Sequence, residues 1–365
     1  MTAVLPVRSS PTPPDLDGLR HDVDTVLRQF LQEKTAAAAA RNLPDQAART
    51  LEEFLSAGGK RLRPVLCALG WQAATATPLP KPVVRVAAGL EMFHAFCLIH
   101  DDIIDDSATR RGAPTVHRAL AAHHAAHRPG PLAERLGASC ALLIGDLALT
   151  WADELVHTAG LTHSQLIMLQ PVLNAMRTEV IYGQYLDVTA TGCPTPDLER
   201  ALAIVRYKTA KYTCERPLHI GAVLGGAPAR LLRELTDYAV PLGEAFQLRD
   251  DLLGVFGNPR VTGKSHVEDL REGKHTMLVA LALRDASPAH ATVLRRLIGN
   301  PHVTEADATQ IRNILTVTGA RTHVENMIDE RRERALRLLG SARTIRPAVQ
   351  NSLRRLAETT TKRTA

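Results

Sequence analysis

The fold is decided by the stretch VVRVAAGLEMFHAFCLIH, residues 83–100, and by the residues DDIIDD, 101–106, that follow it. The first part is apolar nearly all round, which predicts a helix at the centre of a bundle rather than on its surface. The aspartates repel in two pairs at i,i+4 spacing, Asp101 with Asp105 and Asp102 with Asp106. They also fall at the helix C-terminus, where the macrodipole disfavours anions. Several local rules broken together indicate a functional site.

A bound cation would resolve this conflict, and hard oxygen ligands favour Mg²⁺, which commonly bridges a few carboxylates to substrate phosphates. A lone acidic cluster is equally well explained as a solvated helix end. A second stretch, GEAFQLRDDLLGVFG at 243–257, repeats the pattern, with Asp250 and Asp251 near the end of an apolar helical run. We therefore expect two carboxylate clusters to face each other across a central cavity that suits a phosphate head and a hydrocarbon tail.

Helical periodicity continues through most of the chain, and the period-two alternation typical of strands is missing. The fold is predicted to be all-α, a single domain over residues 15–360 with roughly 12 helices. The proline-rich leader 1–14 and the tail 361–365 are expected to be disordered, and 110–132 and 258–274 to form loops. The helices are expected near residues 15–33, 45–57, 64–76, 83–106, 131–157, 163–187, 195–224, 229–257, 275–286, 304–318, 320–340 and 346–360.

Composition excludes several classes of protein. The 365 residues are 45% hydrophobic, and the net charge of +6 is scattered rather than gathered into a stripe, so nucleic-acid binding is not expected. The five cysteines are odd in number and form no CxxC pair, which favours a reducing cytoplasm over a disulfide framework. There is no basic and apolar leader and no run of eighteen apolar residues, so neither export nor membrane insertion is expected.

Basic residues complete the pattern, because a diphosphate needs cationic side chains as well as metals. They occur in GGKRLRP (58–64), directly after the first acidic cluster, and in YKTAKYTCERP (207–217). Taken singly, each is more simply a surface charge. Together they predict two diphosphate pockets, one bridged by metal and one held by Lys and Arg alone. The residues concerned are Lys60, Arg61, Arg63, Arg110, Arg111, Lys208 and Lys211.

With these motifs the chain resembles the trans-isoprenyl diphosphate synthases, specifically geranylgeranyl diphosphate synthases of actinobacterial type. The resemblance covers roughly residues 20–345 and implies their all-α isoprenoid synthase bundle. Its motifs occur in the family's order: GGKRLRP, HDDIIDDSATRRGAPTVH, GDL (145–147), GQYLD (183–187), YKTAKYTCERPL, FQLRDDLLGVFG and TGKSHVEDLREGKHT.

The resemblance implies a role for individual residues. Asp101 and Asp105 would hold two Mg²⁺ ions and Asp250 a third, with Asp102 and Asp251 in support. The allylic diphosphate would be contacted by Arg110, Lys208, Lys264 and Lys274. Isopentenyl diphosphate would be held without metal by Lys60, Arg63, His94 and Arg111. The carbocation would be stabilised by Thr209, Gln247 and the Lys208 carbonyl.

One position departs from the family pattern, because the second motif of many relatives ends in an aspartate at its fifth position, where this chain has Gly254. The second metal site should then be less richly liganded, with Asp269 and Glu268 as partial compensation. The alternative is an ordinary helix-end glycine.

Product length is expected to depend on the helix that carries the first cluster. In the family the fifth residue before that cluster commonly limits the chain; here it is Phe96, although Cys97 and Phe93 lie closer to the Asp101 face. The resemblance implies geranylgeranyl diphosphate, with twenty carbons, as the main product. A farnesyl or longer-chain synthase is the alternative.

The family also implies a homodimer, which the apolar residues of 131–157 would support. A terpene cyclase is a rival reading, but it would have no use for the Lys60, Arg63 and Arg111 pocket. A catalytically silent subunit of a heteromer is a rival from another class. Four histidines are interpreted as surface-loop residues: His117, His123, His124 and His127.

Overall fold

The computed structural model describes residues 15–75, 77–257 and 267–361. The helices and strands are α1 (Leu16–Ala39), α2 (Gln46–Ser56), α3 (Leu62–Ala74), α4 (Lys81–Ile104), β1 (Thr109–Arg110), β2 (Ala113–Pro114), α5 (Val116–Ala125), α6 (Gly130–His157), α7 (His163–Ala190), α8 (Leu198–Ile204), the π-helix η1 (Val205–Glu215), α9 (Arg216–Leu224), α10 (Ala229–Phe256), α12 (Glu268–Glu272), α13 (Met277–Asp285), α14 (Pro288–Leu297), α15 (Glu305–Val317), α16 (Ala320–Ser341) and α17 (Pro347–Thr361). The all-α prediction is confirmed, with one short hairpin, β1–β2, in the described part.

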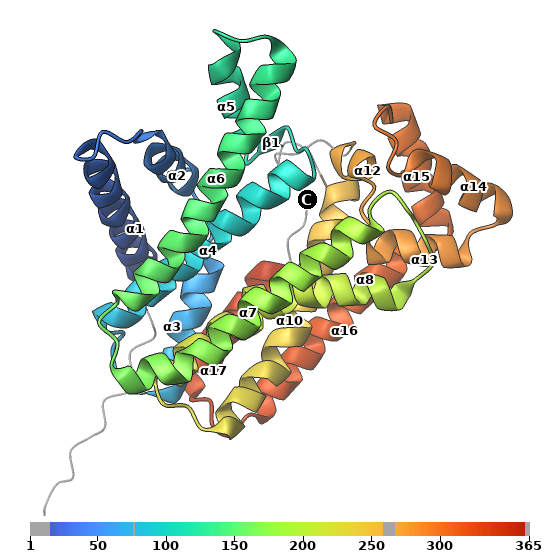
Figure 1. The fold of residues 1–365 in the computed structure, drawn as a ribbon. Coiled ribbons are helices and arrows are strands. Elements are labelled where there is room, and N and C mark those ends of the chain that lie inside the picture. The colour runs from blue at the N-terminus through green and yellow to red at the C-terminus, as the bar shows by residue number, and fades with distance from the viewer. Residues whose placement is uncertain (1–14, 76, 258–266, 362–365) are drawn as a thin grey trace, which may run out of the picture.

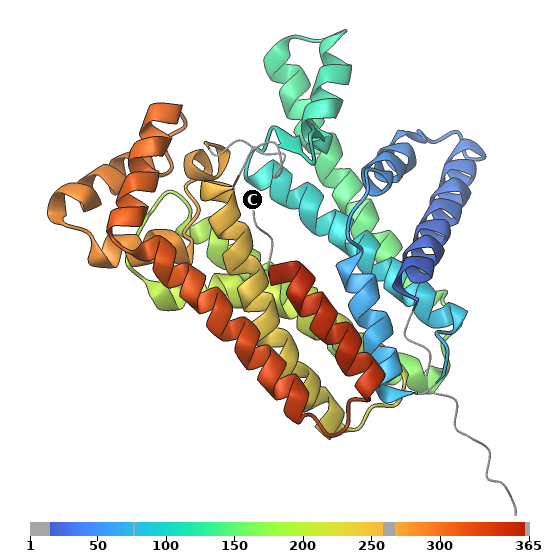
Figure 2. The same cartoon turned by 180° about the vertical axis from the view of Figure 1, so that it is seen from behind.

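The central position of α4 is as the sequence predicts. It packs against α1, α3 and α6, and α6 runs along it in Figure 1. By length and composition α4 could cross a membrane, but 67% of its most apolar window is buried in the bundle, as in the core helix of a soluble protein. On the other side of the molecule α10, α16 and α17 lie side by side (Figure 2).

Two clusters of buried side chains hold the bundle together. The larger one includes side chains of α1 to α7, η1, α9, α16 and α17, and the smaller one includes side chains of α8, η1 and α12 to α16. Helix α10 belongs to both, since Leu242 lies in the first cluster and Leu248 and Leu252 lie in the second. The C-terminal half of α4 thus packs in the larger cluster, and the C-terminal part of α10 packs in the smaller one.

The structure differs from the prediction at several boundaries. The expected loop 110–132 contains the hairpin and α5, because Val116, Leu120 and Ala121 are buried. His117 is also buried, so its interpretation as a surface-loop residue was wrong; His123 and His127 are exposed. The expected helix 195–224 is divided into α8, η1 and α9, and α12 and α14 are additional.

The predicted tail begins one residue too early, because Thr361 is buried as the last residue of α17. The leader 1–14 and the rest of the tail lie outside the described residues.

Candidate functional site

Each aspartate of the first acidic cluster is paired with a cation, which explains how the chain tolerates four aspartates within six residues. The four ion pairs are Asp101–Lys208 at 2.9 Å, Asp102–Arg110 at 2.6 Å, Asp105–Lys274 at 2.9 Å and Asp106–Arg118 at 2.8 Å. The cations come from η1, the β1–β2 hairpin, the segment after α12, and α5. Two of these cations, Lys208 and Lys274, come from distant parts of the chain, and the other two come from the segment that directly follows the cluster.

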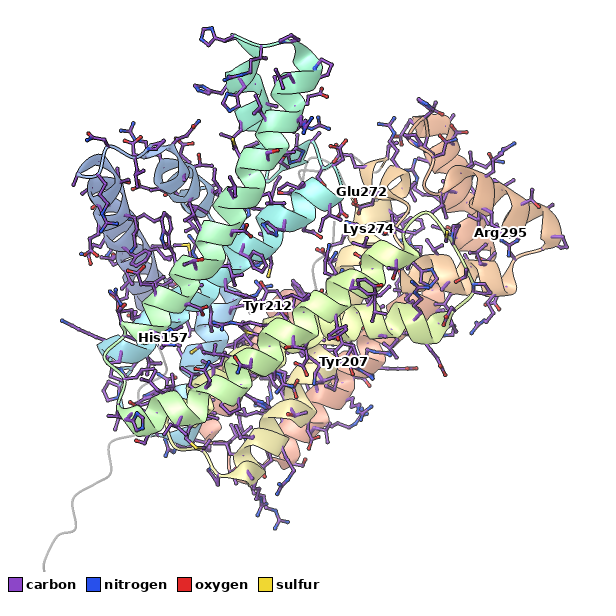
Figure 3. All side chains as sticks on the ribbon, viewed as in Figure 1. His157, Tyr207, Tyr212, Glu272, Lys274 and Arg295 are labelled. Atoms are coloured by element: carbon purple, nitrogen blue, oxygen red, sulfur yellow. The ribbon has the colours of Figure 1, made fainter. Side chains whose placement is uncertain are left out.

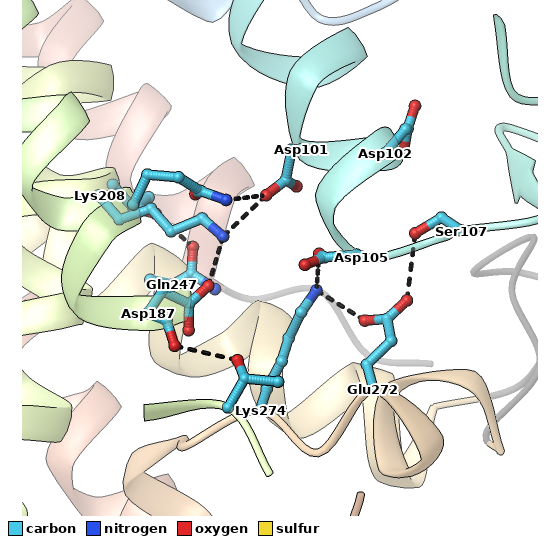
Figure 4. A network of polar contacts seen from close by, with 12 residues as sticks. Asp101, Asp102, Asp105, Ser107, Asp187, Lys208, Gln247, Glu272 and Lys274 are labelled. Carbon is cyan, nitrogen blue, oxygen red and sulfur yellow. Dashed lines mark hydrogen bonds and ion pairs between the residues drawn. The ribbon is translucent and has the colours of Figure 1, made fainter. Parts of the chain in front are cut away.

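Two lysines each join two carboxylates at the end of α4 (Figure 4). Lys208 Nζ also lies 2.5 Å from Asp187 Oδ2, and Lys274 Nζ lies 2.8 Å from Glu272 Oε2. Gln184 Nε2 donates to Asp101 Oδ1 over 3.0 Å. These partners place α7, η1 and the segment after α12 around one point at the end of α4.

The lysines also set the charge of these groups. Burial acts to raise the pKa of Asp101, but Lys208 and Lys274 outweigh it, so this pKa falls well below its ordinary value. Burial raises the pKa of Asp105, and Asp101 adds to this effect against the opposing charge of Lys274. Burial opposes the charge on Lys208, but Asp101 and Asp187 raise its pKa overall. The two lysines thus stay protonated in a mostly buried site.

Asp102 has a different environment from Asp101. It is 1% exposed, and both of its carboxylate oxygens accept hydrogen bonds from Arg110 Nε, at 2.9 and 2.7 Å. This geometry favours a role in positioning Arg110, and the assignment of Asp102 among the metal ligands stays a prediction.

The second acidic cluster is connected to η1. Thr209 Oγ1 donates to Gln247 Oε1 over 2.6 Å, and Gln247 Nε2 donates to Asp251 Oδ1 over 2.6 Å. Burial raises the pKa of Asp251 to about 7, and the negative charges of Asp250 and Asp269 add to this effect. Thr209, Gln247 and Asp251 therefore form one chain of hydrogen bonds beside Asp250.

Gly254 is explained by a close approach. A Cβ atom built on it would lie 1.8 Å from Asp269 Oδ2, so the carboxylate of α12 occupies the space of any side chain there. The carboxylate that the second motif lacks in sequence is thus present in space, supplied by α12. Of the two compensating residues that the sequence suggested, Asp269 is the one that contacts Gly254.

The segment that carries Asp269 and Lys274 is fixed by contacts between glycine backbones. Gly273 has φ of +71°, and a Cβ there would lie 2.6 Å from Gly299 Cα and 3.3 Å from Gly192 N. Gly192 N donates to Gly273 O over 3.1 Å, and Gly299 N donates to Leu270 O over 2.9 Å. Three loops that are distant in sequence therefore touch at this point.

The donor set fits Mg²⁺. In the part of the chain that the structure describes, no three His, Cys, Asp or Glu side chains form a closed metal cage. Mg²⁺ does not require one, because it usually binds one or two carboxylates and completes its shell with water and phosphate oxygens. Asp101 and Asp105 on α4, and Asp250 on α10, offer such partial sets. Lys264, predicted to contact the same diphosphate, lies outside the described residues.

The residues predicted for the metal-free pocket contact neighbouring segments of the chain. Arg111, at the tip of the hairpin, donates to the carbonyl of Gly58, which places it against the loop that carries the exposed Lys60. Arg63 Nη2 donates to Thr213 Oγ1 over 2.7 Å, and His94 Nδ1 lies 2.8 Å from the Tyr212 hydroxyl.

Arg61 and Lys211 pair with carboxylates outside the two acidic clusters. Arg61 is 5% exposed and pairs with Glu91 and Asp24, each at 2.8 Å, so it fixes the turn into α3. Lys211 pairs with Glu179 at 2.9 Å and with Glu215 at 3.2 Å, and its place in a diphosphate pocket stays a prediction.

The residues expected to limit product length lie together below the acidic cluster. The rings of Phe93 and Phe96 have centroids 5.4 Å apart, and Phe93 packs edge-on to Tyr212 at 5.9 Å. Cys97 is partly buried on the same helix. Asp187, Glu272 and Tyr212 were not predicted as site residues, although each lies inside a motif quoted for the resemblance.

Comparisons with known proteins agree with this site. Residues 44–315 match the model of the polyprenyl synthetase family. The chain is 41% identical to a geranylgeranyl pyrophosphate synthase from Corynebacterium glutamicum, solved in complex with isoprenyl diphosphate and magnesium. The TM-score is 0.91, over 96% of this chain and 100% of that one. It is 32% identical to a geranylfarnesyl diphosphate synthase of Aeropyrum pernix, over 78% of this chain and 83% of the relative. It is also 32% identical to a farnesyl diphosphate synthase of Geobacillus stearothermophilus, over 81% of this chain and 98% of the relative. The chain therefore belongs to the polyprenyl synthetase family and is a trans-prenyl diphosphate synthase.

Proposed function

We propose that this protein is a geranylgeranyl diphosphate synthase, which condenses isopentenyl diphosphate head to tail with allylic diphosphates and stops mainly at twenty carbons. The observation that carries the proposal is the aromatic cluster of Phe93, Phe96 and Tyr212. Phe96 lies five residues before Asp101, or about 7.5 Å along the helix axis. A growing chain that extends from the diphosphate along α4 meets these rings.

The allylic diphosphate binds between the ends of α4 and α10. Asp101, Asp105 and Asp250 would hold Mg²⁺, with three ions per active site, and Asp269 would add the carboxylate that Gly254 lacks. Arg110, Lys208, Lys264 and Lys274 contact the diphosphate. Bound Mg²⁺ supplies charge neutralisation for the leaving group.

The protein's own groups then serve ionisation and condensation. Lys208 and Lys274 stay protonated and stabilise negative charge on the leaving diphosphate. The Thr209 hydroxyl, the Gln247 amide and the Lys208 carbonyl direct their dipoles at the allylic cation. Lys60, Arg63, His94 and Arg111 hold isopentenyl diphosphate, whose double bond attacks that cation. The released diphosphate then accepts the proton that the new carbocation loses.

The active species is proposed to be a homodimer. Large apolar side chains are exposed on α6 and α7, and burial in an interface would remove them from water. They are Leu132, Leu142, Leu143, Ile167, Met168, Ile181, Tyr182, Tyr185 and Val188. Light scattering should give twice the chain mass of 39.7 kDa. A fully active monomer at micromolar concentration would contradict this assembly.

The proposal is tested by incorporation of radiolabelled isopentenyl diphosphate with dimethylallyl, geranyl or farnesyl diphosphate as primer. Chromatography of the dephosphorylated products should give a main peak at twenty carbons. Phe96→Ala should shift the products to twenty-five carbons or more, and Phe96→Tyr, which keeps the ring, should not. A main product of fifteen or twenty-five carbons in the wild type would refute the proposed chain length. Absence of any incorporation would indicate a silent subunit.

A further inference from the structure

Tyr212 connects two of the four residues proposed to hold isopentenyl diphosphate, His94 and Arg63. Its side chain is buried, and its hydroxyl oxygen lies 2.8 Å from His94 Nδ1. The guanidinium carbon of Arg63 lies 4.2 Å from the centre of its ring. One side chain on η1 thus contacts one residue on α4 and another on α3. In Figure 3 Tyr212 lies at the middle of the bundle, between α4 and α7.

The hydrogen bond between His94 Nδ1 and the Tyr212 hydroxyl can run in either direction, depending on which nitrogen of His94 carries the proton. Burial lowers the pKa of His94 well below its ordinary value, and the charges of Arg63 and Arg110 add to this effect, so the imidazole is neutral. A neutral imidazole has one N–H. If Nδ1 accepts from the Tyr212 hydroxyl, the proton stays on Nε2, which is then free to donate to an anion.

Arg63 is oriented by the same residue. Its guanidinium lies over the Tyr212 ring, and Nη2 donates to Thr213, the next residue of η1. Its Nε is buried and has no hydrogen-bond partner among the residues that the structure describes. A buried donor without a partner is costly, and an anionic ligand would supply one.

We propose that Tyr212 is a positioning residue for isopentenyl diphosphate. Its hydroxyl donates to His94 Nδ1 and so leaves Nε2–H to bind the diphosphate, and its ring holds the guanidinium of Arg63 in place. This inference rests on the proposed function. It predicts that the tyrosine hydroxyl acts on one substrate only, and that it acts through His94.

The test measures binding of isopentenyl diphosphate alone by titration calorimetry, because without an allylic primer there is no reaction. Tyr212→Phe keeps the ring and removes the hydroxyl, and should weaken binding about three- to tenfold, the range of one hydrogen bond. The Michaelis constant for the allylic primer should stay unchanged. Tyr207→Phe is the matched control, since Tyr207 lies on the same π-helix with 37% of its surface exposed, and it should bind as the wild type does.

A double-mutant cycle separates positioning from packing. His94→Gln presents an amide N–H where Nε2–H stood, without a tautomer to fix, so adding Tyr212→Phe to it should cause little further loss. The proposal is overturned if Tyr212→Phe binds as the wild type does, if both substrates are weakened alike, or if the loss is equally large beside His94→Gln. If the wild type neither binds isopentenyl diphosphate nor incorporates it, the proposed function itself has failed.

Discussion

Gly254→Asp would restore the aspartate that many relatives carry in the second motif, yet we expect it to impair this enzyme. A Cβ at this position lies 1.8 Å from Asp269 Oδ2. Atoms in ordinary contact are about 3.5 Å apart, so the Asp269 carboxylate would have to move by more than about 1.5 Å. Forcing extra atoms into such a space costs about 1–3 kcal/mol. A fourth carboxylate would also join Asp250, Asp251 and Asp269.

If the displaced carboxylate is needed for metal binding, this cost falls on the metal-bound state. Since 1.4 kcal/mol corresponds to a factor of ten, a cost of about 1–3 kcal/mol should weaken Mg²⁺ binding by about five- to 140-fold. Calorimetric titration of Mg²⁺ in the presence of inorganic pyrophosphate measures this directly, and the Mg²⁺ dependence of the unfolding temperature gives a second readout.

Three further variants separate space from charge. Gly254→Ala adds the Cβ without the charge and should already weaken Mg²⁺ binding. Gly340→Ala, in α16 with no atom near its Cβ position, is the matched control and should be neutral or slightly stabilising. Gly254→Asp combined with Asp269→Gly exchanges the two side chains and should bind Mg²⁺ better than Asp269→Gly alone. Wild-type Mg²⁺ affinity in both Gly254 single variants would refute the reasoning.

Three other predictions concern the charged groups. Asp101→Ala or Asp105→Ala should abolish turnover with little change in the free energy of unfolding, because Lys208 keeps Asp187 and Lys274 keeps Glu272; near wild-type activity at saturating Mg²⁺ would contradict the metal assignment. Arg110→Ala should lower the free energy of unfolding by about 3–5 kcal/mol, because it removes the guanidinium that neutralises the buried Asp102. Arg111→Ala, at the exposed hairpin tip, should instead raise the Michaelis constant for isopentenyl diphosphate, and equal urea midpoints for the two variants would argue against this difference. The pKa of Asp251 is about 7 in the folded protein against an ordinary 3.8, so the folded state holds a proton that the unfolded state has lost between these values. Without metal, this contribution is complete below about pH 4 and is lost as the pH rises through 7; relative to Asp251→Asn, the wild type should lose up to roughly 4 kcal/mol of stability over that window. Parallel stability profiles for the two proteins would exclude it.

The sequence predicted the helices and the two acidic clusters well, because periodicity and motif spacing are local properties. The partners of those clusters were harder to predict. Asp187 and Glu272 join Lys208 and Lys274 only because α7, η1 and the segment after α12 meet in the fold. Arg61 looked like a phosphate ligand, but its turn directs it toward Glu91. These outcomes depend on side-chain direction, which residue type and spacing do not determine.

Gly254, which stands where many relatives have an aspartate, is a second case in which the sequence alone was not sufficient. The sequence signals only that a carboxylate is missing and that Asp269 lies further along the chain. Whether Asp269 reaches the site depends on how α12 docks, through Val267 and Leu270, against the smaller core cluster. The sequence therefore showed that a carboxylate is missing from the motif, and tertiary packing determines that Asp269 takes its place.

The contact between Gly192, Gly273 and Gly299 has a mechanical consequence. Where side chains separate two loops, rotamer changes can absorb a displacement of one of them. Here backbone meets backbone, so a shift of one loop is passed to the others without loss. Helices α14 and α15 flank Gly299 and touch no substrate in the proposed mechanism. Through Gly299 they nevertheless contact the turn at Gly273, which holds Lys274 against Asp105. Substitutions on the outer faces of α14 and α15 should leave activity unchanged. A side chain in place of one of the three glycines should instead displace Lys274 and so weaken binding of the diphosphate.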